Sequence, residues 1–315
     1  MINQNFFQSI TENAIKYCPE LQSWPDQYLL RAQELKLLLK DFHLTTKVPT
    51  LLEIGCGTGF ISALLSRISE ICIATDIPDK NIYSHTPGLN TAALLLKKLN
   101  IKNVHLIGLK NENLPFPNNT FDIIYSAYTL EHVDSRISSV SEIYRVLKPD
   151  GLFICAVPSL MERFLYPTVY YPQILITAFQ YFLIYFKKMI RLQSKLKKPV
   201  PPTTNPAVPQ KKKLSWKNLK KSHPHFPFPY PHGSFPTYFH EVFYYSPFYW
   251  KKLLQKGGFI IFKTKSTMCC LRHPLSYIYC PLKFYLKFEK FETLIGKNRL
   301  FKYFGQNFCM FAKKT

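Results

Sequence analysis

Three closely spaced glycines and the acidic residue before them are the residues with the clearest chemical use. They lie in Leu51–Gly59, which reads Leu-Leu-Glu-Ile-Gly-Cys-Gly-Thr-Gly. Glycines let the backbone turn sharply and approach a ligand with no side chain in the way. An apolar run over 48–54 is short enough for a buried strand, and apolar residues recur at helical spacing after the glycines. Strand, glycine turn and helix indicate a nucleotide-type cofactor site, because a helix N-terminus presents free N–H groups.

The spacing of the glycines narrows the class of cofactor. A dinucleotide site reads G-x-G-x-x-G and holds a pyrophosphate at the helix end, and a phosphate-binding P-loop requires Gly-Lys-Ser/Thr. Neither pattern is present, since the chain reads E-x-G-x-G-x-G from Glu53 to Gly59. An acidic residue two positions before the glycines suits a cofactor with a positive end rather than a polyanion.

This stretch resembles the class I S-adenosylmethionine-dependent methyltransferases, most closely the small-molecule group called type 11. The resemblance implies an enzyme, a methyltransferase with S-adenosylmethionine as its cofactor. It also implies an α/β, Rossmann-like fold, in which a seven-stranded mixed sheet has an antiparallel seventh strand and helices on both faces. The residues implied for the cofactor in this stretch are Glu53, Gly55, Cys56, Gly57, Thr58 and Gly59.

A second acidic residue lies where the next predicted strand, 70–76, ends. Asp76 follows Gly59 by 17 residues, which in an α/β crossover places it at the carboxyl end of the neighbouring parallel strand. A carboxylate there can accept hydrogen bonds from both hydroxyls of a ribose. We therefore predict Asp76, with Ile77 beside it, as cofactor residues. The alternative is a turn or helix-capping aspartate, because Pro78 follows.

The loop after the third predicted strand, 104–109, departs from the family pattern. Related methyltransferases carry an acidic residue in this loop that reads the adenine edge. Here Leu109 and Lys110 stand at that place and one residue is inserted. Asn111 or Glu112 is the predicted substitute, and a simple polar turn is the alternative.

The fourth predicted strand, 121–126, leads into a segment that resembles the family's S-x-x-x-L-E-H-V. The resemblance places Ser126 against the methionine half of the cofactor. His132 is the candidate base, because an unperturbed imidazole titrates close to working pH. A purely structural hydrogen bond is the alternative for His132. Glu131 would orient His132 or the methyl acceptor.

The resemblance runs to Val157 and resumes near the C-terminus. Before it, helices are predicted over 5–18 and 26–43, where polar Gln33, Glu34, Lys36 and Lys40 interrupt an apolar side. The other predicted elements are helices 58–67, 89–100, 134–147 and 247–256, a turn at 148–151, and strands 152–157, 257–263 and 306–313. The predicted parts of the chain are a helical cover (1–47), the cofactor-binding core (48–158), an aromatic, basic and Pro-rich insertion between strands five and six (159–240), and a C-terminal part (241–315) with an excursion over 267–305.

Charge divides the chain into two halves. Residues 1–159 carry 14 basic and 15 acidic side chains, whereas residues 160–315 carry 27 and 4. So basic a half points to an anionic partner, such as a membrane surface, a nucleic acid or a polyanionic substrate. A solvated lysine-rich surface is the alternative.

An apolar, aromatic segment, 168–186, begins the insertion, and basic residues follow it up to 198. Its length approaches that of a bilayer span. A single crossing would separate strands six and seven from their sheet, and Pro172 weakens a span further. Aromatic residues beside cations are typical of a helix that lies on an anionic membrane. A lid over the acceptor pocket is the alternative.

Three polar residues near the end of the insertion, His232, His240 and Glu241, are predicted on the acceptor side, with a polar turn as the alternative. No metal is predicted, because no His or Cys spacing matches a metal site. The eight cysteines form no C-x-x-C pair, which fits a reduced compartment. Residues 1–19 do not read as a signal peptide. The predicted location is cytoplasmic, peripheral at the membrane if 168–198 contacts lipid.

Three functions are compatible with these patterns. The first is methyl transfer from S-adenosylmethionine to a small or amphipathic acceptor, such as a lipid, a quinone-like ring or a lipid-linked molecule. The second is an RNA methyltransferase, in which the basic half follows phosphates. No N-P-P-Y-type motif follows the fourth strand, which makes nucleic acid the weaker hypothesis. The third is a non-catalytic protein that binds S-adenosylmethionine.

Overall fold

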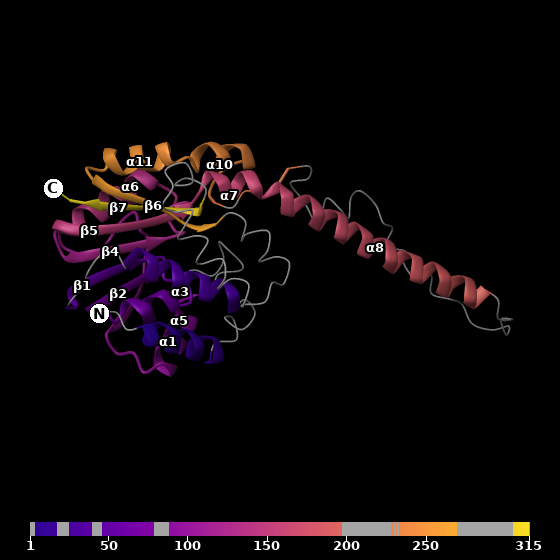
Figure 1. Ribbon diagram of the computed structural model, residues 1–315, viewed down its shortest axis with the longest axis horizontal. Helices are drawn as coiled ribbons and strands as arrows, with labels where there is room; N and C mark the ends of the chain where they lie inside the picture. The colour runs from indigo at the N-terminus through magenta and orange to yellow at the C-terminus, as the bar shows by residue number, and fades with distance from the viewer. Residues whose placement is uncertain are drawn as a thin grey trace.

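The computed structural model describes most of the chain, and its ribbon is shown in Figure 1. The residues described are 4–17, 25–39, 46–78, 88–196, 228, 229, 231, 233–269 and 305–314. The Pro- and Lys-rich part of the insertion and most of the predicted C-terminal excursion lie outside these residues.

A seven-stranded sheet with the order β3-β2-β1-β4-β5-β7-β6 forms the centre of the molecule. β1 to β5 pair in parallel, and β7 runs antiparallel to both β5 and β6. The predicted Rossmann-like mixed sheet is therefore confirmed. The strands are β1 (Val48–Ile54), β2 (Ser69–Asp76), β3 (Val104–Gly108), β4 (Phe121–Ala127), β5 (Leu147–Pro158), β6 (Ile260–Cys269) and β7 (Gly305–Lys313).

Helices cover both faces of the sheet, as the sequence predicted (Figure 1). One face packs against α1 (Gln4–Tyr17), α3 (Pro25–Leu39), α4 (Phe60–Leu65) and α5 (Leu89–Lys98). The other packs mainly against α6 (Arg136–Val146) and α11 (Pro247–Lys256). Successive strand residues point to opposite faces, so Ile154 of β5 joins the first core and Phe153 the second.

β5 differs from its prediction at its start. The sequence Lys148-Pro149-Asp150-Gly151 was expected to form a turn between a helix and a strand that begins at Leu152. Instead β5 begins at Leu147, and the register to β4 jumps from Phe121↔Leu147 to Ile123↔Leu152. The segment is therefore an irregularity within the strand, and Asp150 takes a left-handed φ of 59° there.

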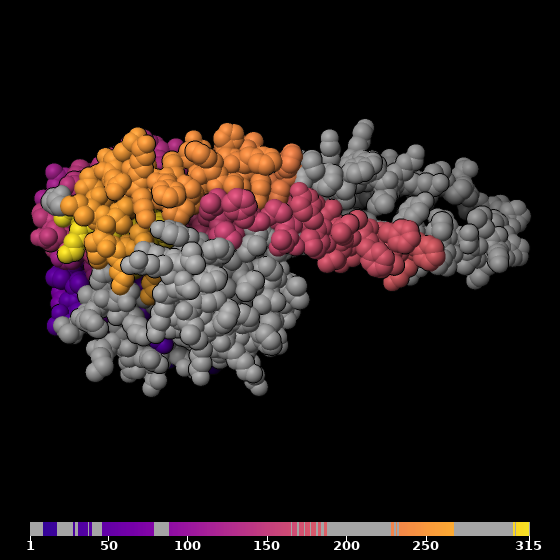
Figure 2. Space-filling model, turned by 45° about the horizontal axis from the view of Figure 1, so that its top comes forward, coloured from indigo at the N-terminus to yellow at the C-terminus, as the bar shows by residue number. Residues whose placement is uncertain are grey.

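The insertion between β5 and β6 adds the helices α7 (Leu160–Leu165), α8 (Pro167–Leu196) and α10 (Tyr238–Tyr244), which precede α11. α8 projects away from the sheet, and Figure 2 shows its surface standing clear of the sheet-bearing body. Among the α8 side chains that the structure describes, the buried ones are Tyr170 and Ile174 in its first turns. Pro172 lies inside the helix, within the second turn.

α3 is bonded to the C-terminal hairpin by a buried carboxylate. Glu34, predicted as a polar interruption of an apolar helix side, is 1% exposed. Its Oε1 accepts hydrogen bonds from Thr267 Oγ1 of β6 at 2.5 Å and from Asn307 Nδ2 of β7 at 2.8 Å. The tyrosine hydroxyl of Tyr128, just after β4, donates to the same carboxylate at 3.1 Å. Glu34 thus joins the start of the chain to its end.

Candidate active site

The glycine turn has the backbone geometry that only glycine adopts readily. Gly55, Gly57 and Gly59 have left-handed φ values of 77°, 52° and 73°. A Cβ on Gly55 would lie 2.0 Å from Thr129 Oγ1, and one on Gly59 would lie 2.8 Å from Ala92 Cβ. A Cβ on Gly57 would meet nothing within 4 Å. Packing therefore requires glycine at positions 55 and 59, whereas Gly57 leaves an open backbone face.

Asp76 lies in direct contact with this turn. Because β1 and β2 are parallel neighbours, both end at the same edge of the sheet. The Gly57 N–H donates to Asp76 Oδ2 at 2.6 Å, and the Ile77 N–H donates to Oδ1 at 2.8 Å. Burial raises the pKa of Asp76, and these two N–H donors oppose the rise. The turn and the carboxylate thus converge, as the strand-end argument predicted.

The open face of Gly57 gives a first testable prediction. Gly57→Ala is expected to fold at a cost of about 1 kcal/mol, because the left-handed backbone disfavours alanine. Its methyl group would occupy the face that a ligand approaches, so binding of S-adenosylmethionine is expected to fall at least about 10-fold, measured by titration calorimetry. Gly59→Ala is the control for stability. Its added Cβ would clash with Ala92, so it should lower the free energy of unfolding more than Gly57→Ala does. Unchanged binding by Gly57→Ala would show that this face does not hold the ligand.

Glu53 is buried beneath the turn, at the end of β1. Its carboxylate accepts a hydrogen bond from the hydroxyl of Ser62 on α4. Burial raises the pKa of Glu53 to about 8, although Ser62 opposes the rise. A cationic group that enters beside this carboxylate would favour its ionised form.

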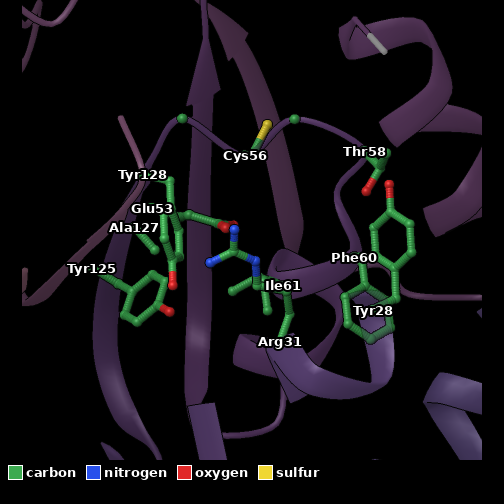
Figure 3. A pocket seen from close by; sticks show the side chains of 12 residues that line it. Tyr28, Arg31, Glu53, Cys56, Thr58, Phe60, Ile61, Tyr125, Ala127 and Tyr128 are labelled. Atoms are coloured by element: carbon green, nitrogen blue, oxygen red, sulfur yellow. The ribbon is translucent and has the colours of Figure 1, made fainter. Parts of the chain in front are cut away.

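A cavity of about 200 Å³ opens between the turn, α3 and the end of β4. Figure 3 shows the side chains of Arg31 and Glu53 directed into it from opposite elements. Burial raises the pKa of the Cys56 thiol, so this cysteine stays protonated. The residues that line the cavity are Tyr28, Arg31, Glu53, Gly55, Cys56, Gly57, Thr58, Phe60, Ile61, Tyr125, Ala127 and Tyr128.

Tyr28, Arg31 and Tyr128 are cavity residues that the sequence did not indicate. α3 was predicted only as part of a helical cover, residues 1–47. An Arg–Glu pair at i,i+3, here Arg31 and Glu34, is ordinarily an exposed helix pair. Nothing local in the sequence therefore marks Arg31 as a residue of the site.

The segment after β4 brings the predicted catalytic residues together. His132 Nε2 lies 4.0 Å from Glu131 Oε1. The side chain of Glu131 is fully buried, and none of the described residues donates a hydrogen bond to either of its oxygens. Ser126, at the end of β4, is buried with no hydrogen-bond partner for its hydroxyl among those residues. Polar atoms without partners are costly in a protein interior, which makes this edge a candidate contact for a ligand.

Glu131 gives a prediction about pH. Burial raises its pKa from 4.5 to about 8, so the native state holds a proton that the unfolded chain releases in this range. Stability should therefore fall as pH rises between these values. Glu131→Gln removes this titration. The free energy of unfolding of the variant minus that of wild type should therefore rise by at most about 3 kcal/mol between about pH 5.5 and pH 9. Urea unfolding at the two pH values measures this, and a constant difference would contradict it.

The loop that carries the residues predicted at the adenine begins beside Asp76. The Leu109 N–H donates to the Asp76 carbonyl oxygen at 2.9 Å, which fixes the loop at this edge. Glu112 Oε1 accepts hydrogen bonds from the Asp134 and Ser135 N–H groups at 2.8 and 3.2 Å, at the start of α6. Asn111 is buried. The Glu112 oxygen is thus engaged by the fold, and the adenine role stays a prediction for both residues.

The predicted acceptor-side residues are placed differently from one another. His232 lies outside the described residues. His240 is exposed on α10, with Nδ1 2.7 Å from Thr237 Oγ1. Glu241 is fully buried, where it accepts from the Gly233 N–H at 2.5 Å and pairs with Arg163 at 3.3 Å. Their acceptor role stays a prediction. In the part of the chain that the structure describes, no cluster of three His, Cys, Asp or Glu side chains could hold a metal ion.

The residues at this edge fit S-adenosylmethionine. The open backbone of Gly57 allows close approach, and the Asp76 carboxylate beside it is an acceptor for ribose hydroxyls. Glu53 lines the cavity, where its carboxylate would suit the cationic end of the molecule.

Comparison with known proteins agrees with this geometry. Residues 52–155 match the family model described as a methyltransferase domain. A Rattus norvegicus protein, the mitochondrial arginine-hydroxylase NDUFAF5, is 31% identical over 36% of this chain and 30% of its own length. The ubiquinone/menaquinone biosynthesis C-methyltransferase UbiE of Citrobacter koseri is 33% identical over 32% of this chain and 39% of its own.

A solved structure, a SAM-dependent methyltransferase from Aquifex aeolicus, is 16% identical over 89% of each chain with a TM-score of 0.45. The chain spans about a third to a half of the length of the curated relatives it matches. The match to the family model nevertheless runs from β1 to β5, the part of the sheet where the glycine turn and Asp76 meet. The chain therefore contains a class I S-adenosylmethionine-dependent methyltransferase domain, with S-adenosylmethionine as its cofactor.

Proposed function

We propose that this protein is an enzyme that transfers methyl groups from S-adenosylmethionine to a small or amphipathic acceptor. The observation that carries the proposal is the contact between Gly57 and Asp76 at the mouth of a cavity. The same edge of the sheet presents Ser126 and Glu131, whose buried oxygens have no hydrogen-bond partner among the described residues. Ser126 is the residue that we propose for contact with the methionine half of the cofactor, and Glu131 lies on the side where we propose the acceptor to bind.

The protein's part in such a reaction is positioning. S-adenosylmethionine supplies a methyl group on a sulfonium, which a nucleophile displaces in line. The glycine turn and Asp76 would hold the adenosine half, and Glu53 would face the amino group. Holding both reactants in place makes the step effectively unimolecular, which supplies much of the rate. His132, on the acceptor side, would take a proton from the acceptor, and Glu131 would orient His132 or the acceptor.

Titration with S-adenosylmethionine, followed by turnover, tests the proposal. The full chain is expected to bind the cofactor and to release S-adenosylhomocysteine when given labelled cofactor and fractionated lipid, RNA and metabolite extracts. No binding would contradict the cofactor site. Binding without label in any fraction would favour the non-catalytic alternative. Label in an RNA fraction, with a salt-dependent gel shift, would favour the nucleic-acid alternative that the basic half suggests.

The acceptor we propose is amphipathic, and two features support it. UbiE of Citrobacter koseri and the demethylmenaquinone methyltransferase of Staphylococcus haemolyticus carry names of enzymes that act on quinones. This chain also carries an apolar helix surface next to its core. A lipid, a quinone-like ring or a lipid-linked molecule combines the polar and apolar parts that such a protein would meet.

We propose that α8 lies on an anionic membrane surface. At 3.6 residues per turn, the exposed large apolar side chains that the structure describes on α8 fall on one face about 140° wide. None of the helices in the described part of the chain is both long enough and apolar enough to cross a bilayer. An aromatic face beside a basic sequence suits the lipid interface. The face consists of Tyr171, Leu175, Ile176, Phe179, Phe182, Leu183 and Phe186.

Flotation with vesicles tests this surface. The chain is expected to float with phosphatidylglycerol vesicles at low salt, less at high salt and little with phosphatidylcholine alone. Phe179→Ser with Phe182→Ser should reduce flotation. Phe248→Ser is the matched control, because Phe248 is 81% exposed but lies on α11. No flotation by wild type at low salt would instead favour α8 as a lid, with no peripheral association. Equal flotation by all variants would show that a surface other than this face of α8 binds the vesicles.

A further inference from the structure

Arg31 differs from every other residue that lines the cavity. Among the described lining residues it alone is basic. It comes from α3, which lies outside the segment that matches the methyltransferase domain. Figure 3 shows its guanidinium in the middle of the cavity wall, between Tyr128 and the side chains of the glycine turn.

Two neighbours fix the guanidinium in place. Its central carbon lies 3.2 Å from the centre of the Tyr128 ring. Its Nη1 lies 3.4 Å from Glu34 Oε2, and Glu34 is itself held by Thr267 and Asn307. Tyr128 takes a left-handed φ of 57°, a conformation uncommon for a bulky side chain. The fold maintains this backbone strain at the residue on which the arginine stacks.

The guanidinium is left with unused donors on its cavity side. An arginine carries five N–H donors. Among the described residues only Glu34 accepts from Arg31, and at a long distance. The side chain is 23% exposed and lines the cavity. An oriented cation with free donors, on the wall of a cavity, is suited to an anionic group of a ligand.

We propose that Arg31 binds the carboxylate at the amino-acid end of the cofactor. The inference rests on the proposed function, because it takes S-adenosylmethionine as the ligand of this cavity. An arginine pairs with a carboxylate through two parallel N–H···O bonds. Glu53 lines the same cavity, where its carboxylate would face the amino group of that end. A carboxylate and a guanidinium on one cavity thus match the two charges of an α-amino acid group.

The proposal makes α3 a part of the cofactor site rather than only a cover over the sheet. Through Glu34, α3 is bonded to β6 and β7, so the C-terminal hairpin also contributes to the position of Arg31. The matched segment, 52–155, contains none of Arg31, Glu34, Thr267 and Asn307. It would therefore lack this binding determinant if produced without the rest of the chain.

Decarboxylated S-adenosylmethionine tests the proposal, because it keeps the sulfonium and the amino group but lacks the carboxylate. Titration calorimetry of the full chain is expected to show tighter binding of S-adenosylmethionine than of the decarboxylated ligand by about 10- to 100-fold. Arg31→Ala should lose this preference while binding the decarboxylated ligand within about twofold of wild type. Arg31→Lys should keep part of the preference, because it keeps the charge without the planar pair of donors.

The other outcomes overturn the proposal in distinguishable ways. If Arg31→Ala weakened both ligands equally, the residue would be structural. If it weakened neither, the carboxylate would be bound elsewhere. In both cases the proposed function would stand, because wild type would still bind the cofactor. If wild type bound neither ligand, the proposed function would fall, and the role of Arg31 with it.

Discussion

Replacing Asp76 with alanine is expected to weaken S-adenosylmethionine binding about 100-fold. In the structure its carboxylate lies 2.6 Å from the Gly57 nitrogen, beside the backbone face that a ligand would approach. Two hydrogen bonds from ribose hydroxyls to a carboxylate contribute about 3 kcal/mol together, which corresponds to a factor of about 100 in affinity. Titration calorimetry measures the effect, and turnover should fall with it.

Asp122→Ala is the matched control for this prediction. Asp122 accepts from the Thr50 N–H at 2.9 Å and pairs with Lys148 at 2.8 Å, so it is bonded much as Asp76 is. It lies at the opposite, amino end of the parallel strands. Its loss should lower stability and leave cofactor affinity within about twofold. Equal affinities of Asp76→Ala and wild type for S-adenosylmethionine would show that Asp76 does not bind the cofactor.

Replacing Glu34 with alanine is expected to lower the free energy of unfolding by about 3–5 kcal/mol. Removing a fully buried carboxylate from its ion pair has a cost of this size. Arg31 keeps 23% of its side chain exposed, so most of the cost comes from the buried partners of Glu34. Arg31 would lose its counter-ion, and Thr267 and Asn307 would lose their shared acceptor. Burial raises the pKa of Glu34, and the charge of Arg31 opposes that rise. Urea unfolding, with cofactor absent, measures the loss.

Asp134→Ala provides the contrast for Glu34. Asp134 pairs with Lys110 at a similar distance, 3.2 Å, but the two side chains are 78% and 61% exposed. Exposed pairs of this kind contribute at most about 1 kcal/mol. A loss of that size or less for Glu34→Ala would show that the buried network adds little, and that packing alone holds α3 on the sheet.

Strand positions were predictable because periodicity and strand-end chemistry are local signals. The predicted and observed first strands have the same bounds, 48–54, and Asp76 ends β2 as expected. The start of β5 was not predictable, because Lys148–Gly151 has turn composition. Pairing across the sheet overrode that composition. Leu147 pairs with Phe121 and Leu152 pairs with Ile123, so residues 148–151 form an irregularity inside the strand.

The sequence by itself determined the glycine turn, the acidic residue at the end of the next strand and the apolar helix that follows the core. Each depends on residues close together in the chain, whose spacing sets backbone geometry directly. Only the tertiary structure decided that Arg31 lines the cavity and that Glu34 is buried. Thr267 and Asn307 lie more than two hundred residues further along the chain, so no local pattern shows that they accompany Glu34. Burial of a charged side chain depends on the packing of distant segments around it, which spacing does not record.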